Sequence, residues 1–133
     1  MIQKEILNLK KEIALNELSL IKAFLKKRDG QSYLDNHSLL IDKALKKLWD
    51  GLEFKNSASL IACGGYGRKE LFPYSDIDLL ILIPKNLNKS LSQKIEQFIT
   101  LAWDLGLRIG HSVRNINETK REIKKDIRCK QIF

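Results

Sequence analysis

Two aspartates at alternate positions introduce an apolar run. Asp76 and Asp78 are separated by Ile77 and followed by the apolar segment 79–83, which Pro84 ends. Because alternate residues of a strand share a face, a strand over 76–83 would point both carboxylates the same way. Neighbouring carboxylates repel unless a cation lies between them, and Mg²⁺ accepts carboxylate and phosphate oxygens together. We therefore predict a catalytic pair that binds Mg²⁺, with Mn²⁺ as the alternative metal, rather than two solvated side chains.

A glycine-rich turn precedes these aspartates. The mostly apolar segment 58–63 leads into Gly64 and Gly65, and a short helix is predicted over 66–71. Glycine lets the backbone approach a phosphate closely, and N–H groups at a helix start favour negative charge. The turn is neither a Walker A loop nor a dinucleotide fingerprint, because it lacks the Lys-Ser/Thr pair and the third spaced glycine. Taken alone, the turn is interpreted as structural, and binding of nucleotide phosphates by Gly64 and Gly65 is the alternative.

Hydrophobic periodicity predicts the elements that position these residues. Helices are predicted over 1–29, 38–52, 91–105 and 116–133. Strands are predicted over 58–63, 76–83 and 107–114. Gly30 is expected to stop the first helix, Ser90 to cap the third, and Asn115 with Glu118 to form a capping box for the last. The fold class is therefore α/β (α+β), with a small mixed sheet flanked by helices and preceded by a helical pair.

The domain organisation follows from the same pattern. Residues 1–55 are predicted to form an amino-terminal helical region and residues 56–133 a core that contains the site. The last predicted helix ends with Ile132 and Phe133 still on an apolar pattern and without a cap. We expect that the chain is truncated there and that these residues alone catalyse poorly.

Composition and charge exclude several classes of protein. The chain of 133 residues carries 24 Lys and Arg against 16 Asp and Glu, a formal charge of +8. This excess suits an anionic partner such as a nucleotide, although a solvated lysine surface explains most of it. Nucleic acid is not expected, because no aromatic residues are interleaved with the lysines. No apolar stretch reaches the roughly 20 residues that span a bilayer, and no signal peptide is recognisable, so a cytoplasmic location is expected.

The cysteines and histidines add no separate chemistry to the prediction. Cys63 and Cys129 are too few for a disulfide framework, and no cluster has zinc-ligand spacing. Cys63, at the end of an apolar run, is interpreted as a small core residue. His37 is interpreted as an ordinary surface residue.

Three segments resemble a known enzyme family. They are Gly64–Leu82 (GGYGRKELFPYSDIDLLIL), Trp103–Asn115 (WDLGLRIGHSVRN) and, more weakly, Leu40–Asp50 (LIDKALKKLWD). A glycine turn followed by Asp-x-Asp resembles the DNA polymerase β-like nucleotidyltransferases. Within that superfamily, the three segments are most similar to the bacterial protein-PII uridylyltransferases, and the similarity covers the chain from about residue 40.

The resemblance implies a nucleotidyltransferase fold and a reaction. The implied reaction is metal-dependent transfer of UMP from UTP to a tyrosine of the PII nitrogen-regulatory protein. Gly64 and Gly65 would hold the triphosphate. Arg68 would bind phosphate, with a salt bridge to Glu70 or an aspartate as a nearly equal alternative. Ser75 would orient Asp76 or, as we favour, cap the turn. His111 and Arg114 match the family's His-Ser-Val-Arg stretch, and His111 is expected to be buried and structural.

The resemblance also leaves alternatives open. Many members of the superfamily use a third carboxylate on a later strand, and the predicted strand 107–114 has none. Glu70, Asp104 or a residue beyond Phe133 could supply it. The alternatives to uridylyl transfer are another base or acceptor, as in an adenylyltransferase, or an inactive fragment that only binds nucleotide.

Overall fold

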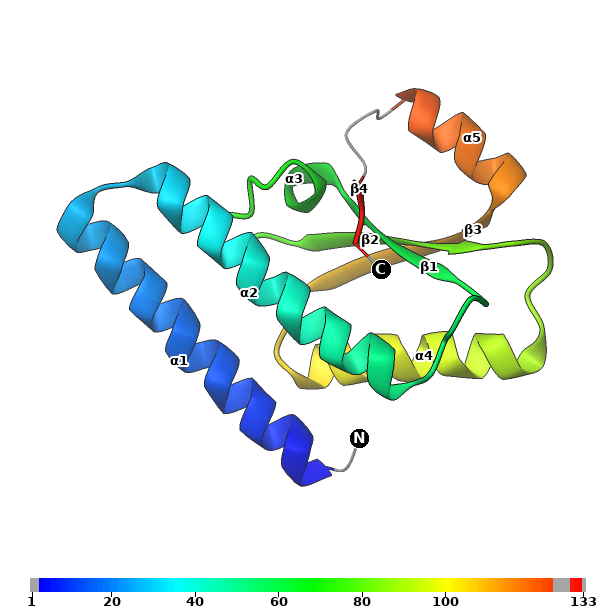
Figure 1. The fold of residues 1–133 in the computed structure, drawn as a ribbon, viewed down its shortest axis with the longest axis horizontal. Helices are drawn as coiled ribbons and strands as arrows, with labels where there is room; N and C mark the ends of the chain where they lie inside the picture. The colour runs from blue at the N-terminus through cyan, green and yellow to red at the C-terminus, as the bar shows by residue number, and fades with distance from the viewer. Residues whose placement is uncertain (1–2, 126–129, 133) are drawn as a thin grey trace.

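The computed structural model describes residues 3–125 and 130–132 (Figure 1). Two long helices, α1 (Gln3–Lys27) and α2 (Gly30–Gly51), form an antiparallel hairpin at the amino terminus. The helix α2 begins eight residues earlier than predicted, and Gly30 starts it instead of stopping the helix before it. The reason is the Asp29 side chain, which accepts a hydrogen bond from the N–H of Ser32 at 3.1 Å and caps α2.

The described part of the chain contains a four-stranded mixed sheet with the order β3-β2-β1-β4. Its strands are β1 (Ser59–Cys63), β2 (Ile77–Ile83), β3 (Ile109–Asn115) and β4 (Lys130–Gln131). The strand β2 pairs antiparallel with β1 and parallel with β3, and β4 pairs antiparallel with β1. The predicted mixed α/β fold is confirmed.

The carboxyl-terminal part differs from its prediction. The helix α5 (Ile116–Lys125) ends well before Phe133, and β4 then pairs with β1. Ile132 continues this pairing through a hydrogen bond from its N–H to Leu60 O at 2.9 Å, and its side chain packs against the core. The prediction of one helix over 116–133 was therefore wrong, because a long-range strand pairing replaces its last part. Residues 126–129 and 133 of that prediction lie outside the described residues.

Two predicted helix caps have different outcomes. The helix α4 (Lys89–Asp104) is capped by Asn88, whose Oδ1 accepts from Leu91 N at 2.7 Å, and not by Ser90. The predicted capping box of α5 is confirmed: Glu118 N donates to Asn115 Oδ1 at 3.0 Å, and Asn115 N donates to Glu118 Oε1 at 3.3 Å.

The main core lies between one face of the sheet and the helices α2 and α4. The side chains of Ile77, Leu79, Ile81 and Ile83 alternate along β2 and all belong to this core. Trp49 at the end of α2 stacks on Phe54 with ring centroids 3.8 Å apart, and both rings meet Phe98 of α4 edge-on. The core contains residues on both sides of the predicted boundary at residue 55; the division into two regions stays a prediction.

Candidate nucleotide site

Three strand ends meet at one edge of the sheet. Because β1 runs antiparallel to β2 while β3 runs parallel to it, the carboxyl end of β1 lies beside the amino ends of β2 and β3. The register pairs Asp78 with Cys63 on one side and with Gly110 on the other. The glycine turn after β1 and the aspartates at the start of β2 are therefore brought together, as the predicted site requires.

Asp78 is exposed within β2, and its carboxylate lies against two glycines. A Cβ placed on Gly64 would be 2.7 Å from Asp78 Oδ2, and a Cβ placed on Gly110 would be 3.3 Å from Asp78 Oδ1. Gly64 also has a φ of +57°, a backbone conformation that disfavours other residues. The carboxylate thus occupies space that a Cβ on Gly64 would fill, and a Cβ on Gly110 would be in tight contact with it. The sequence indicated Gly64, whereas the role of Gly110 depends on the pairing of β2 with β3.

Asp76 directly precedes β2 and is separated from Asp78 by the buried side chain of Ile77. Exposed and buried side chains alternate from Asp76 to Leu79, in agreement with a shared orientation of the two aspartates. The nearest cation was not anticipated from the sequence: Nε of Arg108 lies 3.4 Å from Asp76 Oδ1. The position of Arg108, a basic residue directly before β3, would have been the signal in the sequence for this ion pair.

The other predicted site residues lie on the segment between β1 and β2. Gly65 belongs to the short helix α3 (Gly64–Gly67), and a Cβ there would make only ordinary contact, 3.4 Å from Glu70 O. Arg68 forms a salt bridge with Glu70, with Nε 3.1 Å from Oε2. This is the pairing predicted from the sequence as the alternative to phosphate binding. Ser75 is half-buried, and its N–H donates to Phe72 O at 3.1 Å, closing a turn before Asp76.

Two polar contacts attach this turn to α2. The hydroxyl of Tyr66 donates to Oδ1 of Asp42, and Nδ1 of His37 donates to the backbone O of Leu71 at 2.7 Å. Burial, followed by the hydrogen bond and the negative charge of Asp42, raises the pKa of Tyr66 above its usual range. His37 is only 5% exposed, so its interpretation as a surface residue was wrong: it lies under the turn and binds a carbonyl there.

The side chains of β3 differ from two expectations. His111 is exposed rather than buried, because β3 is an edge strand; its ring lies beside Trp103, with centroids 6.5 Å apart. Ser112 and Arg114 share the sheet face of Asp78, since their paired positions in β2 are Leu80 and Leu82. Cys63 is half-buried at the end of β1 rather than fully in the core.

The described residues contain no group of three acidic, histidine or cysteine side chains arranged to hold a metal. Of the candidates for a third carboxylate, Glu70 is paired with Arg68 and Asp104 is exposed at the end of α4. A metal at this site would therefore be held, among these residues, by Asp76 and Asp78. The two glycines beside Asp78, Gly64 and Gly110, fit such a role, because they leave the carboxylate space that a Cβ would fill.

Comparison with known proteins shows the family of this chain. The nucleotidyltransferase domain family matches residues 45–132, from the second half of α2 to the residue after β4. The chain belongs to the nucleotidyltransferase domain family. The match includes the glycine turn, both aspartates and β3, and it leaves α1 outside. Membership supports nucleotidyl transfer as the general chemistry. Nucleotidyltransferase domains generally use a divalent metal ion as cofactor.

Three similar proteins carry the same name. Bifunctional uridylyltransferase/uridylyl-removing enzymes of Nitrosospira multiformis and Chromobacterium violaceum are 41% and 42% identical over 115 residues, which are 82% and 86% of this chain. The corresponding enzyme of Burkholderia lata is 39% identical over 92% of the chain. The matched region is only 13–14% of each relative's length.

Within the described part of this chain, no helix is long and apolar enough to cross a membrane.

Proposed function

We propose that this chain binds the nucleotide for transfer of a uridylyl group from UTP to a tyrosine hydroxyl of a PII-type regulatory protein in the cytoplasm. The observation that carries the proposal is the position of the Asp78 carboxylate against Gly64 and Gly110, with Asp76 two residues earlier, directly before β2. The names of the relatives support uridine as the base and a uridylylated acceptor.

The residues of the site have distinct parts in this reaction. Asp76 and Asp78 would hold a divalent cation, Mg²⁺ or Mn²⁺, which offsets the charge on the phosphates. The turn at Gly64 and Gly65 allows the triphosphate to approach the backbone closely. The acceptor oxygen forms a bond to the α-phosphorus, the bond to the bridging oxygen breaks, pyrophosphate leaves, and the hydroxyl proton passes to a base. Alignment of these atoms supplies much of the acceleration.

Titration calorimetry with UTP tests the nucleotide site. Wild-type protein should bind UTP in the presence of Mg²⁺ or Mn²⁺ and lose most of this binding when the metal is chelated. Asp76→Asn and Asp78→Asn should each lose the metal-dependent part. Asp50→Asn is the matched control, because Asp50 is exposed at the end of α2 and far along the chain from the aspartate pair. Equal binding by wild type and both site variants would contradict the proposal.

The base and the acceptor need separate measurements. ATP, CTP and GTP, titrated under the same conditions, test the preference for uracil, and preferential binding of ATP would favour the adenylyltransferase alternative. Incubation with labelled UTP, Mg²⁺ and PII protein tests transfer. Metal-dependent UTP binding without labelled product would favour the alternative in which these residues bind nucleotide without turning it over.

A further inference from the structure

Asp76 has little support from the sheet. It lies outside β2, its side chain is 71% exposed, and the segment before it turns through Tyr74, which has a φ of +63°. An exposed carboxylate at the end of such a turn has several rotamers of similar energy. Asp78, in contrast, is fixed by strand pairing on both sides and by the two glycines. The two carboxylates therefore differ in how they are held.

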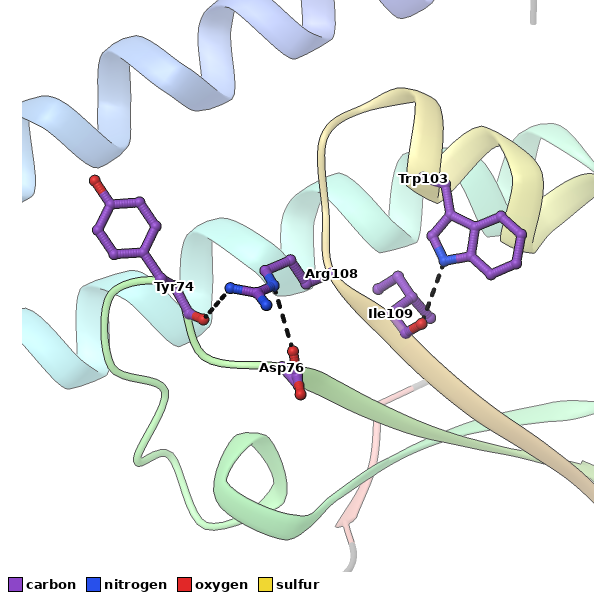
Figure 2. A network of polar contacts seen from close by, with 5 residues as sticks. All are labelled: Tyr74, Asp76, Trp103, Arg108 and Ile109. Atoms are coloured by element: carbon purple, nitrogen blue, oxygen red, sulfur yellow. Dashed lines mark hydrogen bonds and ion pairs between the residues drawn. The ribbon is translucent and has the colours of Figure 1, made fainter.

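Arg108 supplies the contacts that Asp76 lacks (Figure 2). Its Nε lies 3.4 Å from Asp76 Oδ1, and its Nη1 donates to Tyr74 O at 3.1 Å. Its own backbone O accepts from Ile77 N at 2.7 Å. One residue thus holds the backbone before Asp76, the Asp76 carboxylate and the backbone after it.

The position of Arg108 is itself fixed from α4. Figure 2 shows the indole of Trp103 directed at the start of β3, where Nε1 donates to Ile109 O at 3.2 Å. The chain turns sharply between them at Gly106, whose φ is +84°, and Leu107 and Ile109 on either side of Arg108 are buried. The guanidinium is therefore presented from an anchored backbone, although its side chain is 64% exposed.

We propose that Arg108 is a positioning residue that orients Asp76 for binding of the metal–nucleotide complex. The inference rests on the proposed function. Arg108 contacts Oδ1 of Asp76, and the 71% exposed side chain of Asp76 stays accessible to a cation. The charge of Arg108 offsets the repulsion between the two aspartates before the cation arrives. A planar guanidinium can contact the carboxylate and the Tyr74 carbonyl at once, whereas a lysine ammonium acts as a single point charge.

Substitutions at Arg108 test this role by equilibrium binding, without turnover. Premixed Mn²⁺ and UTP are titrated calorimetrically into wild type, Arg108→Gln, Arg108→Lys and Lys85→Gln. Lys85 is the matched control, because it is exposed beyond the opposite end of β2. We expect Arg108→Gln to weaken binding by up to about fivefold, the effect of an exposed ion pair. Arg108→Lys should recover part of this loss, and Lys85→Gln should bind as wild type does.

The outcomes separate this inference from the proposed function. Absence of metal-dependent UTP binding by wild type would contradict the proposed function and this inference with it. Binding by wild type that Arg108→Gln leaves unchanged would overturn the role of Arg108 alone. An equal loss in Arg108→Gln and Lys85→Gln would also overturn it, because a general effect of net charge would then explain both. Thermal melts without ligand should coincide for all four proteins; a lower midpoint for Arg108→Gln with unchanged affinity would show a merely structural residue.

Discussion

The backbone of Gly64 lies directly beside the Asp78 carboxylate, so that a Cβ on Gly64 would be 2.7 Å from Oδ2. Real Cβ atoms do not come this close to an oxygen, and the φ of +57° at Gly64 adds backbone strain for any other residue. The turn after β1 and the aspartate of β2 are therefore fitted to each other, and the first prediction follows from this fit.

Gly64→Ala should reduce both stability and metal-dependent UTP binding. We expect a loss of about 1–3 kcal/mol in the free energy of unfolding, from the left-handed backbone and the displaced carboxylate. Gly110→Ala should bind UTP better than Gly64→Ala does, because its Cβ would be 3.3 Å from Oδ1 and only a small shift is needed. Gly30→Ala is the control, since nothing lies within 4 Å of its Cβ. Urea denaturation and calorimetry measure both effects, and equal behaviour of all three variants would refute the fit.

Tyr66→Phe should give a stability difference that depends on pH. At pH 8 the variant should be less stable by about 1–2 kcal/mol, because the half-buried Asp42 loses its donor. The pKa of Tyr66 is raised above the ordinary value of 10.0. Above that pH the unfolded wild-type chain releases the phenol proton while the folded chain keeps it, so wild type loses stability as pH rises.

The difference between wild type and Tyr66→Phe should therefore shrink above about pH 10. Urea denaturation at pH 8 and pH 10.5 measures this change. Tyr74→Phe is the control, because Tyr74 is 81% exposed and loss of its hydroxyl should change stability at pH 8 by no more than about 0.5 kcal/mol. A constant difference between wild type and Tyr66→Phe across this range would contradict the expectation.

His37→Phe should destabilise the protein although it keeps an aromatic ring at this position. The variant cannot donate to Leu71 O, and that buried carbonyl would lose its partner, which costs about 1–3 kcal/mol. The same substitution at His111, which is exposed, should change stability by no more than about 0.5 kcal/mol. Chemical denaturation of both variants makes the comparison; similar losses at the two histidines would show that the bond to Leu71 is unimportant.

The formal charge of +8 should not produce tight binding to nucleic acid. We expect fluorescence anisotropy with a single-stranded RNA to show weak binding that falls steeply as salt is added, as for a general electrostatic attraction. Sub-micromolar affinity at physiological salt would contradict this expectation and favour a nucleic-acid-binding function.

Local patterns in the sequence were enough to predict the strand β2 and the glycine turn of the candidate site. Alternation of acidic and apolar residues over 76–79, followed by an apolar run to Ile83, predicted a strand with both aspartates on one side, and Gly64 was recognised as part of the turn before it. The capping box at Asn115 was found for the same reason: its partners are three residues apart. Such features depend on neighbours in the chain, so a single sequence contains the information that defines them.

The residues that hold the candidate site in place could be found only from the tertiary structure. Arg108 lies 32 positions after Asp76 and meets it only because β3 pairs in parallel with β2, which also brings Gly110 to Asp78. His37 is buried because α2 packs under the turn at Leu71, and β4 forms because residues near the end of the chain pair with β1. Each of these contacts joins segments distant in sequence. Their local patterns are compatible with other structures, and the packing of the whole sheet and its helices selects among them.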